Sequence, residues 1–326
     1  MRRSALNNYF SRQSTDKMMY IVHERVNKLC EYYTKMRGSD QPAKASLMFR
    51  ALNNDIICEY AFGKSWHFIE NPEWSATYFS AISNMFKASW LHREVHIVSK
   101  IGDFITLLPE WLFPKRGAFK EWSTWAENLR AHIDTSMSGK FIGEKATDKP
   151  TIMEEYQNNK LPPDEKSPKR LFYVALMLLG AGTGTPSLAQ DTALFHVLSN
   201  PTILARLKKE LEEAWPDADS NPPPLAVLEN LPYLRACVKE SLRLVFGAMG
   251  RLQRVNPYEE MVFHDWVIPR GTPIGMTHRL MHLNEKIYPD PWKFDPERWL
   301  QGEKSKELEK YWIPFSRGSR ICLGIP

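Results

Sequence analysis

Cysteine is scarce in this chain, and its spacing excludes the usual cysteine frameworks. Four cysteines occur among 326 residues, at Cys30, Cys58, Cys237 and Cys322, and no two form a C-x-x-C pair. Disulfide-rich and zinc-binding domains need such paired spacings. The sequence therefore predicts a reducing compartment, and the apolar helical surroundings of Cys30, Cys58 and Cys237 are typical of core residues.

Several other features are also missing. The net charge is +5, but no run of Lys and Arg suggests nucleic-acid binding. The apolar stretch at residues 171–179 is shorter than the roughly twenty residues that cross a bilayer, and no signal peptide is visible.

A mildly basic surface would suit an acidic electron-donor protein. With 43% hydrophobic residues, the chain can form a large core in one or two domains.

The most informative motif is F-x-x-G-x-R-x-C-x-G, at residues 315–324. Gly318 and Gly324 let the backbone turn and approach a flat ligand closely. Cys322 offers a sulfur, and Arg320 places a fixed positive charge beside it. A cysteine thiolate is one of the few axial ligands that push electron density into haem iron and favour O–O cleavage. The alternative is a structural cysteine buried in a glycine loop.

Two short motifs lie upstream. An E-x-x-R pair, Glu240 and Arg243, lies on an apolar helix predicted at residues 231–246, where a spacing of three puts both side chains on one face. The run P-E-R-W supplies Arg298. Together they predict a buried triad of Glu240, Arg243 and Arg298 that would hold an irregular segment under the cysteine loop. The alternative is solvated surface pairs, which contribute little.

The order and spacing of these motifs resemble the cytochrome P450 family over nearly the whole chain. Residues 267–299 and 2–11 are similar to filamentous-fungal members of secondary metabolism, which include terpene-oxidising enzymes such as trichodiene oxygenase. The resemblance implies a mainly α fold with a small β region. It also implies an incomplete domain that lacks the N-terminal anchor, first helices, outer sheet strands and the helix after the cysteine loop.

The resemblance also implies a cofactor site. Cys322 would be the axial ligand of haem b, in a loop framed by Phe315, Gly318 and Gly324. Arginines would bind the two haem propionates, because a guanidinium binds a carboxylate with two parallel hydrogen bonds. The positions that match are Arg320, Arg254 and, less closely, Arg3.

A long helix predicted at residues 170–199 matches the oxygen-binding helix of the family. Thr185 matches the threonine that hydrogen-bonds bound oxygen, but Gly184 stands where the family has Asp or Glu, and Pro186 is a second departure. Proline donates no N–H to the carbonyl of Gly182, so we expect that carbonyl to hold a water that partly replaces the acid. Alternatively, the glycines and proline break one helix into two.

Other parts of the chain suggest an apolar substrate pocket. Ala248 and Met249 follow the E-x-x-R helix where the family lines its pocket, and Ala181 lies on the oxygen-side helix. His278 and His282 are four residues apart but lack the acid of an H-E-x-x-H metal site, so we expect a structural role. Residues 111–116 form an apolar and basic patch that favours either membrane-surface contact or core packing.

Periodicity predicts the remaining elements. We expect helices at 14–37, 43–62, 71–108, 118–142 and 201–215, a polar linker at 148–168, a hairpin at 261–268 and a strand at 272–277. The chain is expected to be one partial domain, with substrate-covering helices at 1–168 and the oxygen helix, hairpin and cysteine loop at 169–326.

By resemblance, the protein is a monooxygenase that inserts one atom of O2 into an apolar small molecule, such as a fungal terpenoid. Electrons would come from NADPH through a partner reductase, and full-length relatives would lie on the endoplasmic reticulum membrane. Two alternatives stay open. One is a haem-thiolate isomerase or dehydratase that does not use O2, which Gly184 favours. The other is a non-catalytic truncated product.

Overall fold

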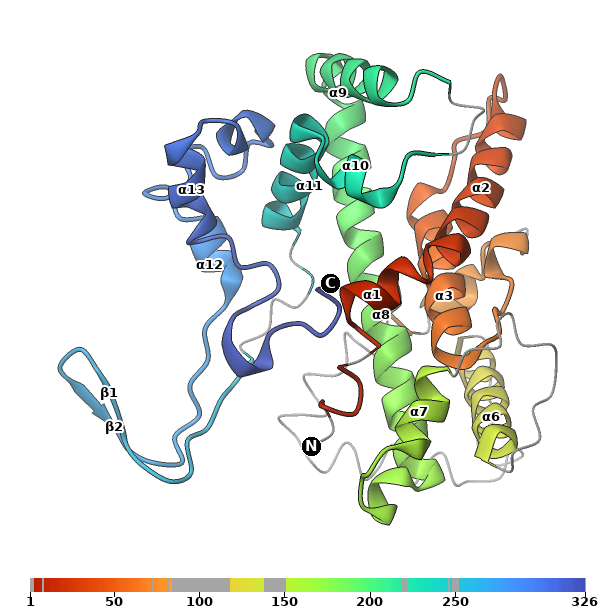
Figure 1. The fold of residues 1–326 in the computed structure, drawn as a ribbon, viewed down its shortest axis with the longest axis vertical. Helices are drawn as coiled ribbons and strands as arrows, with labels where there is room; N and C mark the ends of the chain where they lie inside the picture. The colour runs from red at the N-terminus through yellow and green to blue at the C-terminus, as the bar shows by residue number, and fades with distance from the viewer. Residues whose placement is uncertain are drawn as a thin grey trace. The chain divides into compact units, whose positions relative to one another are not determined.

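The chain is mostly helical, with one two-stranded sheet in the part that the structure describes (Figure 1). The structure is a computed structural model that describes residues 3–7, 9–71, 73–80, 82–83, 118–137, 151–217, 222–245, 247 and 252–325. The predicted fold class is confirmed. The backbone forms two compact units, Met1–Ser187 with Leu323–Pro326, and Leu188–Cys322. The division predicted at residue 168 stays a prediction.

Unit 1 begins with three helices, α1 (Arg12–Asp16), α2 (Met19–Met36) and α3 (Ala45–Phe62). The prediction of one helix at 14–37 was wrong in its first turns. Ser11 caps a separate short helix by accepting a hydrogen bond from the N–H of Ser14, and α2 starts only after a turn at Met18. α3 stops at Gly63, which takes the left-handed conformation typical of a helix C-terminus (φ 72°).

The polar linker predicted at 148–168 was also wrong for residues 151–166. This segment contains α7 (Ile152–Asn158) and a 3-10 turn, η2 (Pro163–Lys166). Thr151 and Glu154 form a capping box, in which each side chain accepts a hydrogen bond from the backbone N–H of the other residue. α6 (Ala118–Met137) covers the described part of the helix predicted at 118–142, and residues 138–142 lie outside the described residues. The predicted helix at 71–108 lies mostly outside the described residues, and the patch at 111–116 lies outside them entirely.

α8 (Pro168–Leu198) is one helix that contains Pro186, so the alternative of two broken helices is wrong. By length and composition, it could cross a membrane. Its apolar part is nevertheless a core element of unit 1, because Leu171, Ala175 and Leu179 are buried in that core. Other apolar side chains of α8, including Tyr173, Met177 and Phe195, are exposed.

A polar seam joins α8 to α3 within unit 1. Asn54 donates a hydrogen bond to the hydroxyl of Thr183 (3.0 Å), and Asn53 donates one to the hydroxyl of Ser187 (3.0 Å). The two helices approach so closely that a Cβ atom on Gly182 would lie 2.7 Å from Cγ1 of Ile57. Glycine at position 182 is therefore required by packing, whereas no described residue lies within 4 Å of a Cβ atom on Gly184.

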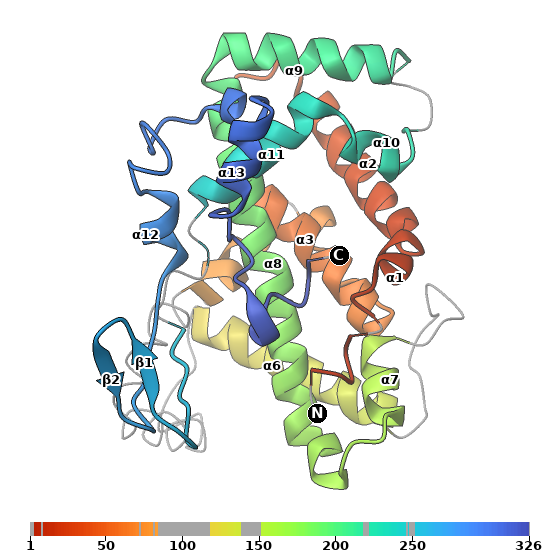
Figure 2. The same cartoon turned by 60° about the vertical axis from the view of Figure 1, so that its left-hand side comes forward.

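Unit 2 is built around α11 (Pro232–Leu244). α9 (Pro201–Ala214), α10 (Leu225–Glu229) and the turn η3 (Pro296–Trp299) pack against it. Figure 2 shows α9 running across the C-terminal end of α8. Two small apolar clusters fill this unit, one around Tyr233 and Phe294 and the other around Tyr288 and Trp299. Three shorter elements complete it: α12 (His278–His282), α13 (Glu303–Glu309) and η4 (Gly318–Arg320).

The small β region of unit 2 is a hairpin of β1 (Met261–Phe263) and β2 (Trp266–Ile268), as predicted. The strands are antiparallel, with Val262 opposite Val267. The strand predicted at 272–277 was wrong, because only Ile274 pairs there, in an isolated bridge with Arg254. A strand needs a neighbour along its length to satisfy its backbone, and one bridge does not supply this.

The pair Gly182 and Gly184 provides a test of the α3–α8 contact. We expect Gly182→Ala to lower stability by about 1–3 kcal/mol, because the new methyl group must displace the stiff side chain of Ile57. Gly184→Ala has open space and should raise stability by about 0.5–1 kcal/mol through helix propensity. Urea unfolding followed by circular dichroism measures both, and equal effects would contradict the close contact. In an Ile57→Ala background the cost of Gly182→Ala should disappear.

Candidate haem-thiolate site

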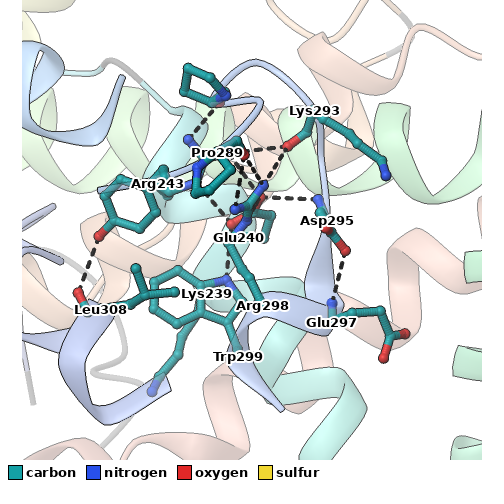
Figure 3. A network of polar contacts seen from close by, with 12 residues as sticks. Lys239, Glu240, Arg243, Pro289, Lys293, Asp295, Glu297, Arg298, Trp299 and Leu308 are labelled. Atoms are coloured by element: carbon teal, nitrogen blue, oxygen red, sulfur yellow. Dashed lines mark hydrogen bonds and ion pairs between the residues drawn. The ribbon is translucent and has the colours of Figure 1, made fainter. Parts of the chain in front are cut away.

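The centre of unit 2 is the carboxylate of Glu240, which is completely buried on α11 (Figure 3). It accepts five hydrogen bonds. Arg243 donates from Nε and Nη2 at 2.9 and 2.8 Å, and Arg298 donates from Nε at 3.0 Å. The backbone N–H of Asp295 and the indole N–H of Trp299 supply the others, at 3.0 and 2.9 Å. The three residues named as a triad thus form one buried network.

The run D-P-E-R-W explains how Arg298 and Trp299 reach this carboxylate. Asp295 caps η3 by accepting a hydrogen bond from the N–H of Glu297, and Pro296 occupies the first position of the turn. The tight turn places the side chains of Arg298 and Trp299 on α11. Trp299 was missed as a member of the network, although its position directly after the arginine was a usable signal.

Arg243 is fully buried and uses all five of its N–H groups. Besides Glu240, it donates to the backbone carbonyls of His282 (2.9 Å), Pro291 (2.6 Å) and Lys293 (3.2 Å). Arg298 adds contacts to the carbonyl of Pro289. One carboxylate and two guanidinium groups leave a net charge of +1, which these four carbonyl dipoles offset. The network therefore holds residues 282–293 as well as η3.

The cysteine loop has a defined backbone. The N–H of Cys322 donates to the carbonyl of Phe315 (2.9 Å), which closes the loop, and the N–H of Ile321 donates to the carbonyl of Gly318 (3.0 Å). Gly318 has φ 81°, a conformation that favours glycine, and Ser316 also has positive φ. The ring of Phe315 lies 6.1 Å from that of Trp312 in an edge-on arrangement.

The four cysteines differ in their surroundings, and none forms a disulfide. Cys58 and Cys237 are buried, as predicted for core residues, and burial raises the pKa of the Cys237 thiol to about 12. Cys30 is exposed on α2, so its prediction as a core residue was wrong. Cys322 is exposed at the end of the closed loop. Within the described ranges, no three His, Cys, Asp or Glu side chains gather as a metal site.

The other predicted cofactor residues have different surroundings. Arg320 is exposed in η4, and Arg254 is exposed with Nη1 donating to the carbonyls of Leu252 and Gln253. Arg3 lies in unit 1, in a turn where its carbonyl accepts a hydrogen bond from the N–H of Leu6. Gly324 is grouped with unit 1 and has open space beside it.

The oxygen-side residues all lie on α8 in unit 1. Thr185 is exposed, and its hydroxyl donates to the carbonyl of Ala181 at 2.6 Å. Gly182 lacks an N–H donor from position 186, because that residue is proline. Thr183 and Ser187 face α3, whereas Ala181 and Thr185 are exposed. The pocket residues Ala248 and Met249 lie outside the described residues.

Comparison with known proteins identifies the family. The model of the family described as cytochrome P450 matches residues 1–326. The chain belongs to the cytochrome P450 family. The resemblance stated from the motifs is thereby confirmed, including its similarity to fungal secondary-metabolism members.

Several curated fungal relatives match the P450 chain over almost its whole length. The cytochrome P450 monooxygenase MO6277 of Ascocoryne sarcoides is 34% identical, covering 99% of this chain and 64% of the relative. The fusicoccadiene C-8 hydroxylase of Phomopsis amygdali is 32% identical (100% and 63%). The monooxygenase TRI4 of Trichoderma arundinaceum is 32% identical (99% and 62%). The chain thus spans a little under two thirds of the length of these relatives.

Neutralising the central carboxylate should be costly. We expect Glu240→Gln to destabilise the protein by about 3–5 kcal/mol, because it leaves two buried guanidinium groups without their counter-charge. Glu303→Gln is the matched control in the same unit, since its ion pair with Lys306 is exposed and should contribute little. Thermal unfolding of both variants checks this, and similar losses in the two would contradict a central role for Glu240.

Proposed function

We propose that this protein is a haem-thiolate monooxygenase. In the overall reaction, one atom of O2 enters a C–H bond of an apolar small molecule, and the other leaves as water. Two electrons and two protons are consumed, the electrons coming from NADPH through a partner reductase. The observation that carries the proposal is the exposed thiol of Cys322 on a closed glycine loop, in a chain of the cytochrome P450 family.

The donor groups of unit 2 fit a haem. The exposed thiol can approach iron without first leaving a core, unlike the buried thiols of Cys58 and Cys237. Arg320 and Arg254 are exposed arginines in the same unit, and the backbone contacts of Arg254 are made by Nη1. Two guanidinium groups match the two carboxylates of a porphyrin. We assign Cys322 to the iron and these arginines to the propionates, with Phe315, Gly318 and Gly324 framing the loop.

When bound, the haem supplies the redox chemistry that activates O2, and a thiolate ligand favours cleavage of the O–O bond. The role of this chain is to hold the sulfur, anchor the acidic edge of the porphyrin and deliver protons. Thr185 holds a proton at Oγ1, which it donates to the carbonyl of Ala181. Rotation of this hydroxyl would turn its proton away from the carbonyl of Ala181. A water bound to the carbonyl of Gly182 would then replace the proton that Thr185 gives up.

Two features support an apolar substrate, such as a terpenoid of secondary metabolism. One relative is named for hydroxylating fusicoccadiene. The assigned pocket residues Ala181, Ala248 and Met249 are small or apolar. We also propose that the protein works at the endoplasmic reticulum membrane and receives its electrons there from the partner reductase.

A second candidate function is a haem-thiolate isomerase or dehydratase that needs no O2. Gly184 favours it, because the position where the family carries an acid holds no side chain. Turnover in the absence of reductase and oxygen would distinguish this candidate from the monooxygenase.

The reduced, carbon-monoxide-bound absorption spectrum tests the thiolate assignment. We expect the haem-loaded chain to show a thiolate-type Soret band, and Cys322→Ser to abolish it because an alcohol does not replace the thiolate. Cys30→Ser is the matched control, since it changes the other exposed cysteine. A thiolate band that survives Cys322→Ser, or a histidine-type band in the unaltered chain, would overturn the assignment.

Restoring the acid tests the proposed proton path. Gly184→Glu has room for the Cβ atom of its side chain among the described residues and should raise the fraction of electrons that end in product rather than in peroxide. Gly184→Gln is the control, because it has nearly the same size but cannot deliver a proton as a carboxylic acid does. Product formed per NADPH consumed is the measurement. No difference between the two variants would count against a proton-limited site.

A further inference from the structure

His282 connects two parts of unit 2 that are far apart in sequence. It ends α12 and is completely buried. Its Nε2 lies 3.0 Å from the backbone N–H of Ile313, and its Nδ1 lies 3.1 Å from the carbonyl of Arg243. A backbone N–H can only donate, so Nε2 must be the unprotonated acceptor, and Nδ1 carries the proton that the carbonyl accepts. Both partners thus require the same neutral tautomer.

The contact with Arg243 is reciprocal. Nη1 of Arg243 donates to the backbone carbonyl of His282 (2.9 Å), while the ring of His282 donates to the backbone carbonyl of Arg243. Each residue therefore binds the main chain of the other with its side chain. Since Arg243 is fixed by Glu240, the imidazole of His282 is held by the same network.

Ile313 lies at the entrance of the cysteine loop. Its carbonyl accepts the N–H of Ser316 (3.0 Å), and the carbonyl of Phe315 accepts the N–H of Cys322 (2.9 Å). The neighbouring Trp312 is also tied to α11, because its indole N–H donates to the carbonyl of Lys239 (3.1 Å). The His282–Ile313 hydrogen bond therefore joins the Glu240 network to the backbone turns that end at the thiol.

We propose that His282 is a positioning residue for Cys322, and that it acts by accepting the N–H of Ile313 so that the cysteine loop is held to the Glu240 network. The consequence for haem rests on the proposed function, whereas the consequence for the loop backbone does not. The simpler alternative is that His282 only fills space in the core.

The surroundings of His282 keep its ring neutral. The titratable and charged groups that face it are His278 on its own helix (ring centroids 5.7 Å apart), Arg243 from α11, and Tyr288 from the segment that follows (6.4 Å). Burial lowers the pKa of His282 to about 4, and the neighbouring His278 and Arg243 oppose its charging further. An imidazolium has no acceptor, so protonation would break the bond to Ile313.

Two amide variants separate the two hydrogen bonds of the ring. His282→Gln can place an amide oxygen near the position of Nε2 and still accept from Ile313. His282→Asn places its amide near Nδ1 and can donate to Arg243, but it is too short to reach Ile313. His278→Gln is the control on the same helix. Two readouts are used: amide hydrogen exchange at Ile313 and Cys322 in the chain without haem, and the thiolate fraction of the reduced carbon-monoxide spectrum with haem.

We expect His282→Asn to speed exchange at both amides about tenfold, the effect of losing one hydrogen bond, and to lower the thiolate fraction. His282→Gln and His278→Gln should change exchange by less than about threefold. Unchanged exchange in His282→Asn, or equal losses in the Asn and Gln variants, would overturn the proposal in favour of simple packing. A thiolate band that is absent even in the unaltered chain would reject the proposed function while the exchange result still decides the role of His282.

An acid titration covers the case in which His282→Asn does not fold. Because the pKa of His282 is lower in the folded than in the unfolded state, the hydrogen bond is fully present above about pH 6.5 and is lost as the pH falls through about 4. Protection of the Ile313 amide in the unaltered chain should fall in this window. His282→Gln, which does not titrate, should keep that protection, and an identical loss in both proteins would contradict the proposal.

Discussion

The carboxylate of Glu240 is the interaction on which unit 2 depends. Burying a charge is costly, and an ion pair repays this cost only when its geometry is good and its remaining polar groups are satisfied. Here the carboxylate of Glu240 accepts five hydrogen bonds, and every N–H group of Arg243 donates one. The network ties α11 to η3 and to residues 282–293, in addition to the apolar clusters of this unit.

The reason for a charged centre rather than an apolar one lies in the segment that it holds. Residues 289–296 contain three prolines, Pro289, Pro291 and Pro296, which cannot donate backbone hydrogen bonds or continue a helix or sheet. The backbone carbonyls of this segment, including those of the prolines, still need donors when they are buried. The two guanidinium groups supply these donors to the carbonyls of Pro289, Pro291 and Lys293. Apolar side chains of similar volume would pack but would leave those carbonyls without donors.

Local signals predicted much of this chain, and long-range contacts limited the rest. The E-x-x-R spacing and the P-E-R-W run named the three charged residues of the network, because spacing on a helix and motif order are visible in sequence. The capping box at Thr151 and Glu154 was also visible in the sequence, but the polar composition of residues 148–168 favoured the prediction of a linker. The strand at 272–277 failed for a different reason, since pairing depends on a neighbour that its own residues do not specify. The bond from His282 to Ile313 joins residues 31 apart and has no local signature.

In unit 1, the packing of one face of α8 against α3 sets the orientation of the proposed catalytic groups. Thr183 and Ser187 are four residues apart and bind Asn54 and Asn53, so this face of α8 is committed to α3. Gly182 also contacts α3, because only a glycine lets Ile57 approach so closely. Residues one and two positions beyond Thr183 are rotated by about 100° and 200°. Thr185 therefore turns away from α3 and is exposed, with its hydroxyl donating to the carbonyl of Ala181.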